Sequence, residues 1–318
     1  MLHRWRTILA FSASLLIIIG VSIRLTIQDR YRLPAAVFYM MSPASIAGLS
    51  VIASWLFRKT NRLVAAKRLL LVAFVSTGWA AATMYYRHPQ QERSDSTVRV
   101  MFWNVFRGHI GWDSIVESIH EENPDAIVLA EAAAYRLPNY FFDDNFSQYP
   151  HVVKLPREVV VLSKHPITDR LKFHQSWKGL YQRLQLNVNG KTLELLIADI
   201  PSPPTYKRDQ PIGLLTEMAS QYADHPTIIV GDFNTPVDSV FLNPIRQTYR
   251  HAFEVAGTGY LATWPIPAPV IAIDHCWVSK HIDVTACRIK WTLHSDHRPI
   301  VTDLSINSKP LASNINSP

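Results

Sequence analysis

The sequence predicts an α/β protein with sheets packed face to face, preceded by a region of membrane-crossing helices. Long apolar blocks without charged residues occupy the first third of the 318-residue chain, and short β-rich runs separated by helical segments follow from Thr97. Charge divides the chain in the same way. Residues 1–98 hold 12 basic and 3 acidic side chains, whereas residues 99–318 hold 20 basic and 22 acidic ones. The net charge of +7 therefore belongs to the apolar region, and the rest lacks the basic surface typical of broad nucleic-acid binding.

Three apolar blocks predict three transmembrane helices within residues 1–87. The blocks run roughly over 8–23, 33–57 and 69–86, and Arg or Lys residues bound each of them. Because a span needs about 20 apolar residues, the second block is comfortably long and the other two are short. A soluble helical bundle would carry a polar face at helical spacing, which these blocks lack. No small-residue cleavage site follows the first block cleanly, so an uncleaved anchor is favoured over a signal peptide.

The basic residues beside the blocks predict the orientation of the chain in an inner or cell membrane. Seven Lys and Arg residues lie on the side of the N-terminus and five on the other side. Under the positive-inside rule, the N-terminus is cytoplasmic. After three crossings the C-terminal domain is expected on the extracytoplasmic side of a multi-pass protein.

A linker is expected over residues 88–96, because this stretch is polar and lacks apolar periodicity. The domain after it is expected over 97–306, with a flexible tail over 307–318. Nine runs have the composition of strands: VRVMFWNV, DAIVLAE, EVVVLS, YQRLQLNV, KTLELLIADI, PTIIVGDF, IDHCWVS, VTACRIKW and PIVTDLSI.

Two helices are expected among these strands, over residues 112–122 and 212–222. In the first, Ile115 and Ile119 are apolar at a spacing of four residues. Because alternating and continuous apolar strands are mixed, we expect α/β layers in which the sheets pack face to face.

Seven polar residues lie where predicted strands end or begin. They are Asn104, Glu131, Asp232, Asn234, Asp274, Asp296 and His297. A carboxylate at the mouth of a buried strand costs free energy unless it is paired or bound to a metal. Each residue alone has an ordinary structural explanation, such as a turn, a cap or a bonded core histidine. Together they are expected to converge on one site.

Hydrolysis at phosphorus is the chemistry that fits this set. It requires a hard divalent cation with oxygen ligands and a water that loses its proton during in-line attack. Glu131 and Asp296 can supply anionic oxygen, and Asn104 a carbonyl oxygen or an amide donor to phosphate. His297, held by a carboxylate such as Asp274, is suited to be the general base. A zinc site is disfavoured, because the chain has two cysteines and neither a CxxC nor an HExxH motif.

Five motifs in this order, MFWNV, IVLAE, GDFNT, AIDHCWVS and HSDHRPI, resemble the successive motifs of the endonuclease/exonuclease/phosphatase superfamily. VVVLSKHPI also resembles a strand and turn of that family, and the resemblance covers about residues 98–306. It implies a four-layer α/β/β/α sandwich, with two facing sheets, helices outside and a site at one end. With its apolar N-terminal third, the chain resembles a membrane-anchored, bacterial-type member.

The resemblance implies a cofactor, Mg²⁺ or Mn²⁺. Glu131 resembles the main metal ligand of the family, and Asn104 resembles its neighbour that reaches the metal or the phosphate. Asp296 is then expected on the metal side of the site.

The resemblance also implies the catalytic residues. Asp232 and Asn234 resemble the pair that orients the attacking water and a phosphate oxygen. Asp274 resembles the carboxylate that polarises the catalytic histidine, here His297.

One motif departs from the family. Where some branches have a His or a Tyr, this chain has Asp199, followed by Ile200 and Pro201. An ionised carboxylate cannot donate to phosphate, and its charge repels an anionic substrate unless a cation intervenes. The identity of the leaving-group acid is therefore open, and Tyr181 and Arg183 are candidate substitutes for phosphate contact.

The expected function is a membrane-anchored, divalent-metal-dependent phosphoester hydrolase, with nucleic acid as the first substrate on family resemblance alone. A lipid or inositol phosphate hydrolase is the alternative within the enzyme class, since tethering favours a substrate in the membrane. A catalytically impaired domain that binds a phosphorylated ligand is the alternative outside it. The lipid bilayer is an expected partner, and no protein partner can be inferred. Cys276 and Cys287 are expected either as a disulfide across neighbouring antiparallel strands or as two buried thiols.

Overall fold

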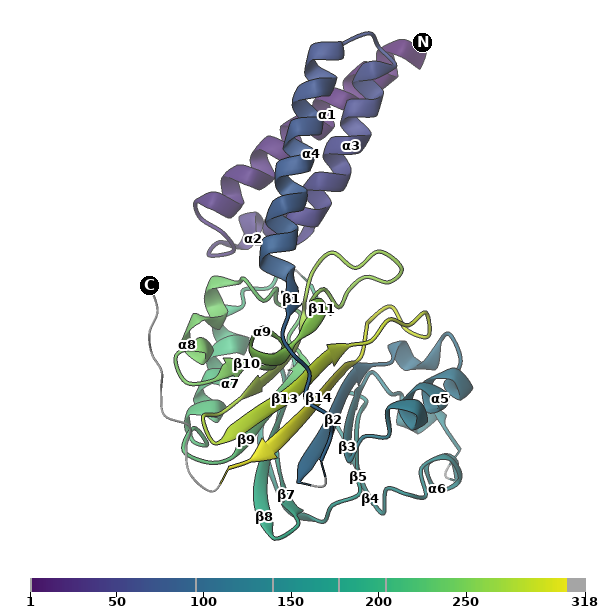
Figure 1. Ribbon diagram of the computed structural model, residues 1–318, viewed down its shortest axis with the longest axis vertical. Helices are drawn as coiled ribbons and strands as arrows, with labels where there is room; N and C mark the ends of the chain where they lie inside the picture. The colour runs from purple at the N-terminus through teal and green to yellow at the C-terminus, as the bar shows by residue number, and fades with distance from the viewer. Residues whose placement is uncertain (1, 95, 139, 177, 204, 308–318) are drawn as a thin grey trace. The chain divides into compact units, whose positions relative to one another are not determined.

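The computed structural model describes residues 2–94, 96–138, 140–176, 178–203 and 205–307, which divide into two compact units (Figure 1). The helical unit contains the N-terminal residues up to Tyr85. The α/β unit contains most of the chain from Tyr86 onward. Each unit has its own apolar core.

In the part of the chain that the structure describes, the helical unit contains four helices. They are α1 (Leu2–Leu25), α2 (Arg32–Met40), α3 (Pro43–Arg58) and α4 (Leu63–Met84). Its core is built from small and branched apolar side chains, among them Ala10, Ile46, Ala53 and Leu69. Much of the remaining apolar surface of α1 and α4 is exposed, including Phe11 and Phe74. Helices with apolar residues on the outside are typical of a lipid environment.

Among the described residues, two helices are long and apolar enough to cross a membrane, His3–Leu25 with 23 residues and Leu63–Met84 with 22. The sequence prediction that these first and third spans are short was therefore wrong. The second predicted span is interrupted, because α2 and α3 meet at a bend of 69°. The pair amounts to a third span only if the two pieces cross the membrane together as a broken helix.

The bend between α2 and α3 has a local cause. Pro43 is the first residue of α3, and a proline disfavours the helical conformation of the residue before it. Ser42 instead adopts an extended conformation and caps α3, since its side-chain oxygen accepts a hydrogen bond from the Ser45 amide at 3.1 Å. Hydropathy alone counts the residues on both sides of this cap as one apolar block.

Over its described residues, the α/β unit contains two six-stranded sheets. The first sheet has the order β13 (Ile282–Ile289), β14 (Ile300–Ile306), β2 (Thr97–Asn104), β3 (Ala126–Ala130), β5 (Val159–Ser163), β4 (His151–Leu155). The second sheet has the order β10 (Arg250–His251), β12 (Asp274–Val278), β9 (Thr227–Asp232), β8 (Lys191–Asp199), β7 (Gly179–Val188), β6 (Ile167–Ser176). The short strands β1 (Tyr85–Arg87) and β11 (Thr258–Tyr260) pair separately.

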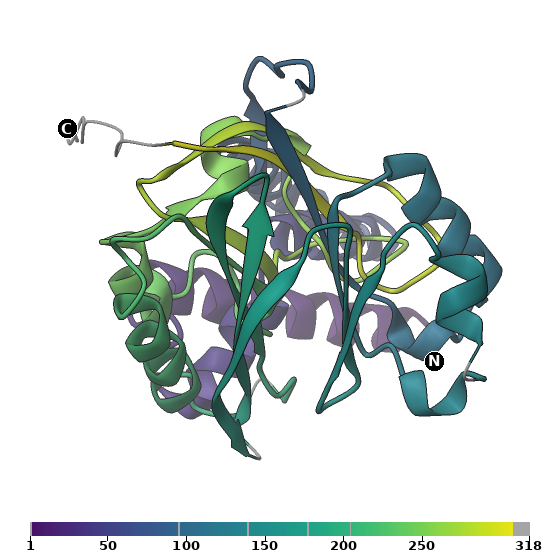
Figure 2. The same cartoon turned by 90° about the horizontal axis from the view of Figure 1, so that it is seen from below.

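Helices cover the outer faces of both sheets, as Figure 2 shows in a view from below. Against the first sheet lie α5 (Trp112–Glu122) and α6 (Phe141–Asn145). Against the second lie α7 (Asp209–Ser220) and α8 (Asn243–Arg246), and α9 (Ala252–Ala256) follows β10. The sheets face each other, since β2 and β3 contact β9 and β14 contacts β12. The predicted α/β fold with sheets packed between helices is confirmed.

The two cysteines are free, buried thiols that lie on different sheets. Cys276 is on β12 and Cys287 is on β13, so the alternative of a disulfide across neighbouring strands is wrong and the alternative of two buried thiols is confirmed. The Thr302 hydroxyl lies within 3.5 Å of both sulfur atoms. Burial raises the pKa of both thiols.

Gly231 allows β8 and β9 to run close together just before the end of β9. A Cβ atom at this position would lie 1.9 Å from the carbonyl oxygen of Ala198, a backbone atom that cannot swing away. We therefore expect Gly231→Ala to destabilise the α/β unit by about 1–3 kcal/mol, the usual range for overpacking a core. Gly213→Ala is the matched control, since nothing lies within 4 Å of the added atom on α7. Equal thermal unfolding midpoints for the two variants would contradict this prediction.

Candidate active site

Five central strands bring the predicted polar residues to one end of the sandwich. In the first sheet β2 and β3 are parallel, so Asn104 and Glu131, the residue after β3, emerge together. In the second sheet β8 and β9 are parallel with Asp199 opposite Asp232. The antiparallel strand β12 begins at Asp274, which pairs with Asp232. These five residues are spread over 171 positions of the sequence, and strand register alone brings them to the same end.

Side-chain alternation decides which groups enter the space between the sheets. Leu196 and Ile229 belong to the apolar cluster on the outer, helix-covered face of the second sheet. Asp199 and Asp232 are three residues further along the same strands and therefore project from the opposite face. Asp274 is beside Asp232 in register and shares that face. Three carboxylates are thus aligned across the second sheet.

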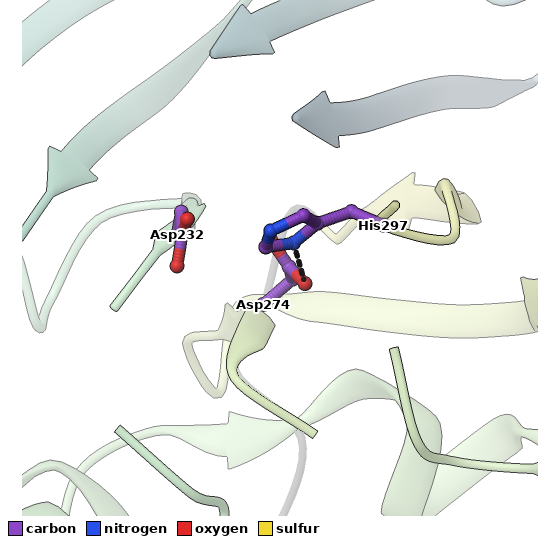
Figure 3. A group of neighbouring side chains, drawn as sticks. All are labelled: Asp232, Asp274 and His297. Carbon is purple, nitrogen blue, oxygen red and sulfur yellow. Dashed lines mark hydrogen bonds and ion pairs between the residues drawn. The ribbon is translucent and has the colours of Figure 1, made fainter. Parts of the chain in front are cut away.

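His297 and Asp274 form a buried pair. The His297 Nδ1 atom lies 2.8 Å from Asp274 Oδ2, and the exposed fractions of the two side chains are 7% and 1%. Figure 3 shows the other edge of the imidazole facing Asp232. One ligand atom from each of the three residues lies within 4.8 Å of the others. This arrangement suits transfer of a proton to and from the imidazole.

Backbone contacts hold His297 in place. The Trp103 indole donates to the His297 carbonyl oxygen at 3.0 Å, and the Ser295 hydroxyl donates to the Asn104 carbonyl oxygen at 2.7 Å. The His297 amide in turn donates to Ser295 Oγ at 3.2 Å. The loop that carries the histidine is therefore tied to the end of β2.

Asn104 joins the carboxylates of the two sheets. Its side-chain amide donates to Glu131 Oε1 at 3.2 Å and to Asp232 Oδ2 at 3.0 Å. Its side-chain oxygen, Oδ1, accepts a hydrogen bond from the Phe106 backbone amide at 3.1 Å. In this arrangement the side-chain amide of Asn104 donates to two carboxylates and orients them, while its Oδ1 atom accepts the Phe106 amide.

Asn234 and Asp296 lie at the edge of the same cluster. The Asn234 backbone amide donates to Asp232 Oδ1 at 2.9 Å, whereas its side chain donates to the Ile200 carbonyl oxygen at 2.9 Å. Asp296 Oδ2 accepts the Trp264 indole at 3.2 Å. The structure thus brings together all seven polar residues that the sequence singles out at strand ends.

Burial and neighbouring charges shift the protonation of the two central groups. Burial, reinforced by the Asp274 charge, raises the pKa of Asp232 to about 8. For His297, burial opposes the charged form, but the adjacent Asp274 carboxylate outweighs it and raises the pKa to about 10.

Comparisons with known proteins identify this arrangement. The Endonuclease/Exonuclease/phosphatase family matches residues 101–297, which include all seven polar residues. The chain belongs to this family. A comparison with curated proteins gave no significant match.

Solved structures share the fold of the α/β unit at low sequence identity. The endonuclease/exonuclease/phosphatase from Bacteroides vulgatus aligns with a TM-score of 0.53 at 16% identity, covering 67% of this chain and 100% of that one. The human Nocturnin catalytic domain with bound sulfate gives 0.54 at 17%, with 70% and 97% covered. The 3′ phosphatase NExo from Neisseria, bound to a product DNA hairpin, gives 0.52 at 16%, with 64% and 98% covered. Nucleases and phosphatases are therefore the neighbours of this fold.

The site has donors that fit the divalent cation used by the endonuclease/exonuclease/phosphatase family. They are predominantly carboxylate oxygens, which suit Mg²⁺ or Mn²⁺. The Glu131 side chain is 34% exposed, and its Oε2 atom lies 3.6 Å from an Arg107 nitrogen. Among the described residues, no group donates a hydrogen bond to Asp274 Oδ1, although that atom is buried. Glu131 is the more accessible ligand, because Asp274 is already engaged with His297.

Asp199, the departure from the family motif, is paired across the site. Arg157, in the turn between β4 and β5, donates from Nε to Asp199 Oδ2 at 2.6 Å. Burial raises the pKa of Asp199 to about 6, although the Arg157 charge acts in the opposite direction. Sequence inspection missed Arg157, since an arginine in a hairpin turn carries no signal of its own.

Tyr181 and Arg183 lie away from the cluster. They pair in register with Ala198 and Leu196, which face the outer cluster, whereas Asp199 faces the other way. The Tyr181 hydroxyl donates to the Pro211 carbonyl oxygen at 2.9 Å, and the Arg183 Nε atom donates to Glu194 at 2.7 Å. Tyr181 and Arg183 were expected to contact phosphate in place of Asp199. That expectation was wrong, because their positions along β7 place their side chains on the opposite face of the second sheet.

Proposed function

We propose that this protein is a membrane-anchored, divalent-metal-dependent phosphoester hydrolase, with a phosphodiester of nucleic acid as the first substrate class. The observation that carries the proposal is the buried His297–Asp274 pair beside Asp232, at the end of the sandwich where Asn104 and Glu131 also emerge. Independent caps and turns do not require a histidine, a carboxylate partner and a further carboxylate within 4.8 Å.

Each residue has a role that follows from its contacts. His297 is the group that takes the proton from the attacking water, and Asp274 orients the imidazole and stabilises its charged form. Asp232, held by Asn104 and by the Asn234 amide, positions that water. Glu131 is the proposed metal ligand, with Asp296 on the same side. A bound Mg²⁺ or Mn²⁺ would supply positive charge toward phosphate oxygens in a site rich in carboxylates.

A lipid phosphoester is the second candidate substrate, because exposed apolar side chains lie on loops that carry site residues. Trp291 and Leu293 are 59% and 57% exposed on the loop between β13 and β14, which also carries Asp296 and His297 (Figure 1). Ile110, on the segment that follows Asn104, is 51% exposed. Apolar and aromatic side chains around a site favour contact with a membrane interface.

Hydrolysis assays on the purified full-length protein in detergent test the proposal. The substrates are plasmid DNA, a single-stranded oligonucleotide, a phospholipid in mixed micelles and a phosphomonoester, each with Mg²⁺, Mn²⁺ or EDTA. We expect hydrolysis that requires the metal and is greatest on a nucleic-acid phosphodiester. Hydrolysis of lipid alone would replace the first substrate class with the second. No metal-dependent turnover of any substrate would leave a phosphate-binding domain without catalysis.

The location that we propose for the α/β unit is extracytoplasmic, and it depends on the bent pair of α2 and α3. If the pair crosses the membrane, the chain makes three crossings and the unit lies opposite the N-terminus. If the pair returns to the same face, two crossings leave the unit on the side of the N-terminus. We expect alkaline phosphatase fused after Ser96 to be active and green fluorescent protein at the same point to be dark. The reverse result would place the unit in the cytoplasm.

A further inference from the structure

The turn between β4 and β5 is fixed against the proposed metal ligand. Its residues Arg157 and Glu158 have φ values of 58° and 61°. The Glu158 carbonyl oxygen accepts the Ala132 amide at 2.7 Å, directly after Glu131. Arg107 completes the connection, since its backbone amide donates to the Glu131 carbonyl oxygen and its Nε to the Glu158 carboxylate, both at 2.7 Å. The turn is therefore part of the site wall.

Arg157 crosses from this wall to the other sheet. It belongs to the first sheet through the β4–β5 turn, whereas Asp199 ends β8 of the second sheet. The 2.6 Å ion pair between them thus spans the mouth of the sandwich. Asp199 pairs with Asp232 on the adjacent strand β9, and β9 lies between Asp199 and Asp274, the partner of His297.

The Arg157 guanidinium has N–H groups that its hydrogen bond to Asp199 does not use. It carries five N–H groups in a fixed planar fork, and the contact with Asp199 uses the one on Nε. Within the described ranges, Arg157 makes no other side-chain hydrogen bond or ion pair, and its side chain is 31% exposed. Arg107, the neighbouring cation, is already shared between Glu158 and Glu131. Arg157 is therefore the cation of this wall that is free to bind an anion.

A phosphate that binds Arg157 is also repelled by the ionised carboxylates of the site. Among the described residues, the carboxylates around the site include Glu131, Asp199, Asp232, Asp274 and Asp296. An incoming phosphate is repelled by each ionised carboxylate, and Asp199 is the carboxylate that Arg157 contacts. A guanidinium is suited to phosphate, because its fork matches two phosphate oxygens.

We propose that Arg157 binds the substrate phosphate, and that Asp199 is a positioning residue that holds the guanidinium across the mouth of the site. This inference rests on the proposed function, because it assigns the phosphate contact of the same site. Arg157 thereby supplies the phosphate contact that an ionised Asp199 cannot make by itself. Tyr181 and Arg183 do not make this contact, because their side chains lie on the outer, helix-covered face of the second sheet.

Phosphate affinity tests the inference without requiring turnover. The full-length protein in detergent is titrated with inorganic phosphate in the presence of Mg²⁺, and the phosphate-induced rise in Tm is recorded. In parallel, inorganic phosphate is used as a competitive inhibitor of bis(p-nitrophenyl) phosphate hydrolysis. The variants are Arg157→Ala, Arg157→Lys and the control Lys280→Ala, which breaks an exposed ion pair with Asp224.

We expect Arg157→Ala to weaken phosphate binding and raise KM by about 10- to 100-fold, the loss typical of a hydrogen bond to a charged group. Arg157→Lys keeps the charge but not the fork, so an intermediate loss is expected. Lys280→Ala should behave as wild type. Wild-type phosphate affinity in a folded Arg157→Ala protein would overturn the inference, and if Arg157→Ala does not fold, wild-type affinity in Arg157→Lys would overturn it.

A second substitution separates phosphate contact from a merely structural ion pair. Without Arg157, the Asp199 carboxylate faces the phosphate uncompensated. Arg157→Ala combined with Asp199→Asn should therefore bind phosphate more tightly than Arg157→Ala alone. No such rescue would contradict the role given to Asp199.

The two proposals fail in different ways. A wild-type protein that binds phosphate through Arg157 but hydrolyses nothing would refute the hydrolase proposal and support the phosphate site. A protein that hydrolyses phosphoesters with Arg157→Ala unimpaired would refute only the phosphate site. A wild-type protein with neither turnover nor a phosphate-induced rise in Tm would refute both.

Discussion

Replacing His297 with alanine is expected to lower kcat for phosphoester hydrolysis by about 10²- to 10⁴-fold, the usual cost of losing a general base. The imidazole is the titratable nitrogen group placed against both Asp274 and Asp232. Its loss removes the proton acceptor without removing the proposed metal ligand Glu131. Steady-state kinetics with saturating Mg²⁺ would measure the effect, and KM should change much less than kcat.

Two variants control this experiment. His297→Gln keeps a side-chain donor that can reach Asp274, so an equal loss would show that the missing base matters and not an unpaired buried carboxylate. His294→Ala removes a histidine from the same loop, where its Nδ1 atom lies 3.2 Å from the Ser118 hydroxyl. It should retain wild-type kcat. Wild-type turnover in a folded His297→Ala protein would refute the assigned base.

Asp232→Asn is expected to abolish most activity and at the same time to stabilise the metal-free fold by about 0.5–2 kcal/mol. The side chain is buried beside Asp274, and burial raises its pKa from 3.8 to about 8. Between these two values the folded state holds a proton that the unfolded state has released. The contribution of Asp232 to stability is therefore complete below pH 3.8 and is lost as the pH rises through about 8. An amide at this position does not titrate.

Thermal unfolding in EDTA from pH 4 to pH 8 would measure this difference. The advantage of Asp232→Asn over wild type should grow as the pH rises across that range. The exposed Asp224→Asn, which loses only a surface ion pair with Lys280, is the control. A variant that is less stable than wild type at pH 8 would show that Asp232 serves the fold and not the chemistry.

The regular elements of the α/β unit could be predicted where the sequence has a period or a buried apolar run. The helix over Trp112–Glu122 has its predicted bounds, because Ile115 and Ile119 face the first sheet. The strands β4 and β6 escaped prediction, since they lie at sheet edges and carry charged residues on an exposed face. An edge strand buries too little to leave a continuous apolar run.

The residues of the site could be predicted where they follow runs of buried apolar residues. Asp232 and Asp274 follow runs of buried apolar residues, and polar groups in that position require a partner. The facing direction of Tyr181 depends on strand register, which the sequence does not specify there. Arg157 depends on how a turn of one sheet meets a strand of the other, and no local pattern encodes that contact.

Anomalous diffraction from crystals of the full-length protein grown with Mn²⁺ and inorganic phosphate would test the central claim most directly. We expect one or more Mn²⁺ ions in the α/β unit, with a Glu131 oxygen at about 2.0–2.3 Å and a phosphate oxygen on the same ion. We also expect that His297 and Asp274 remain paired beside this phosphate. Mn²⁺ or phosphate bound elsewhere in the α/β unit, with Glu131 unligated, would contradict it.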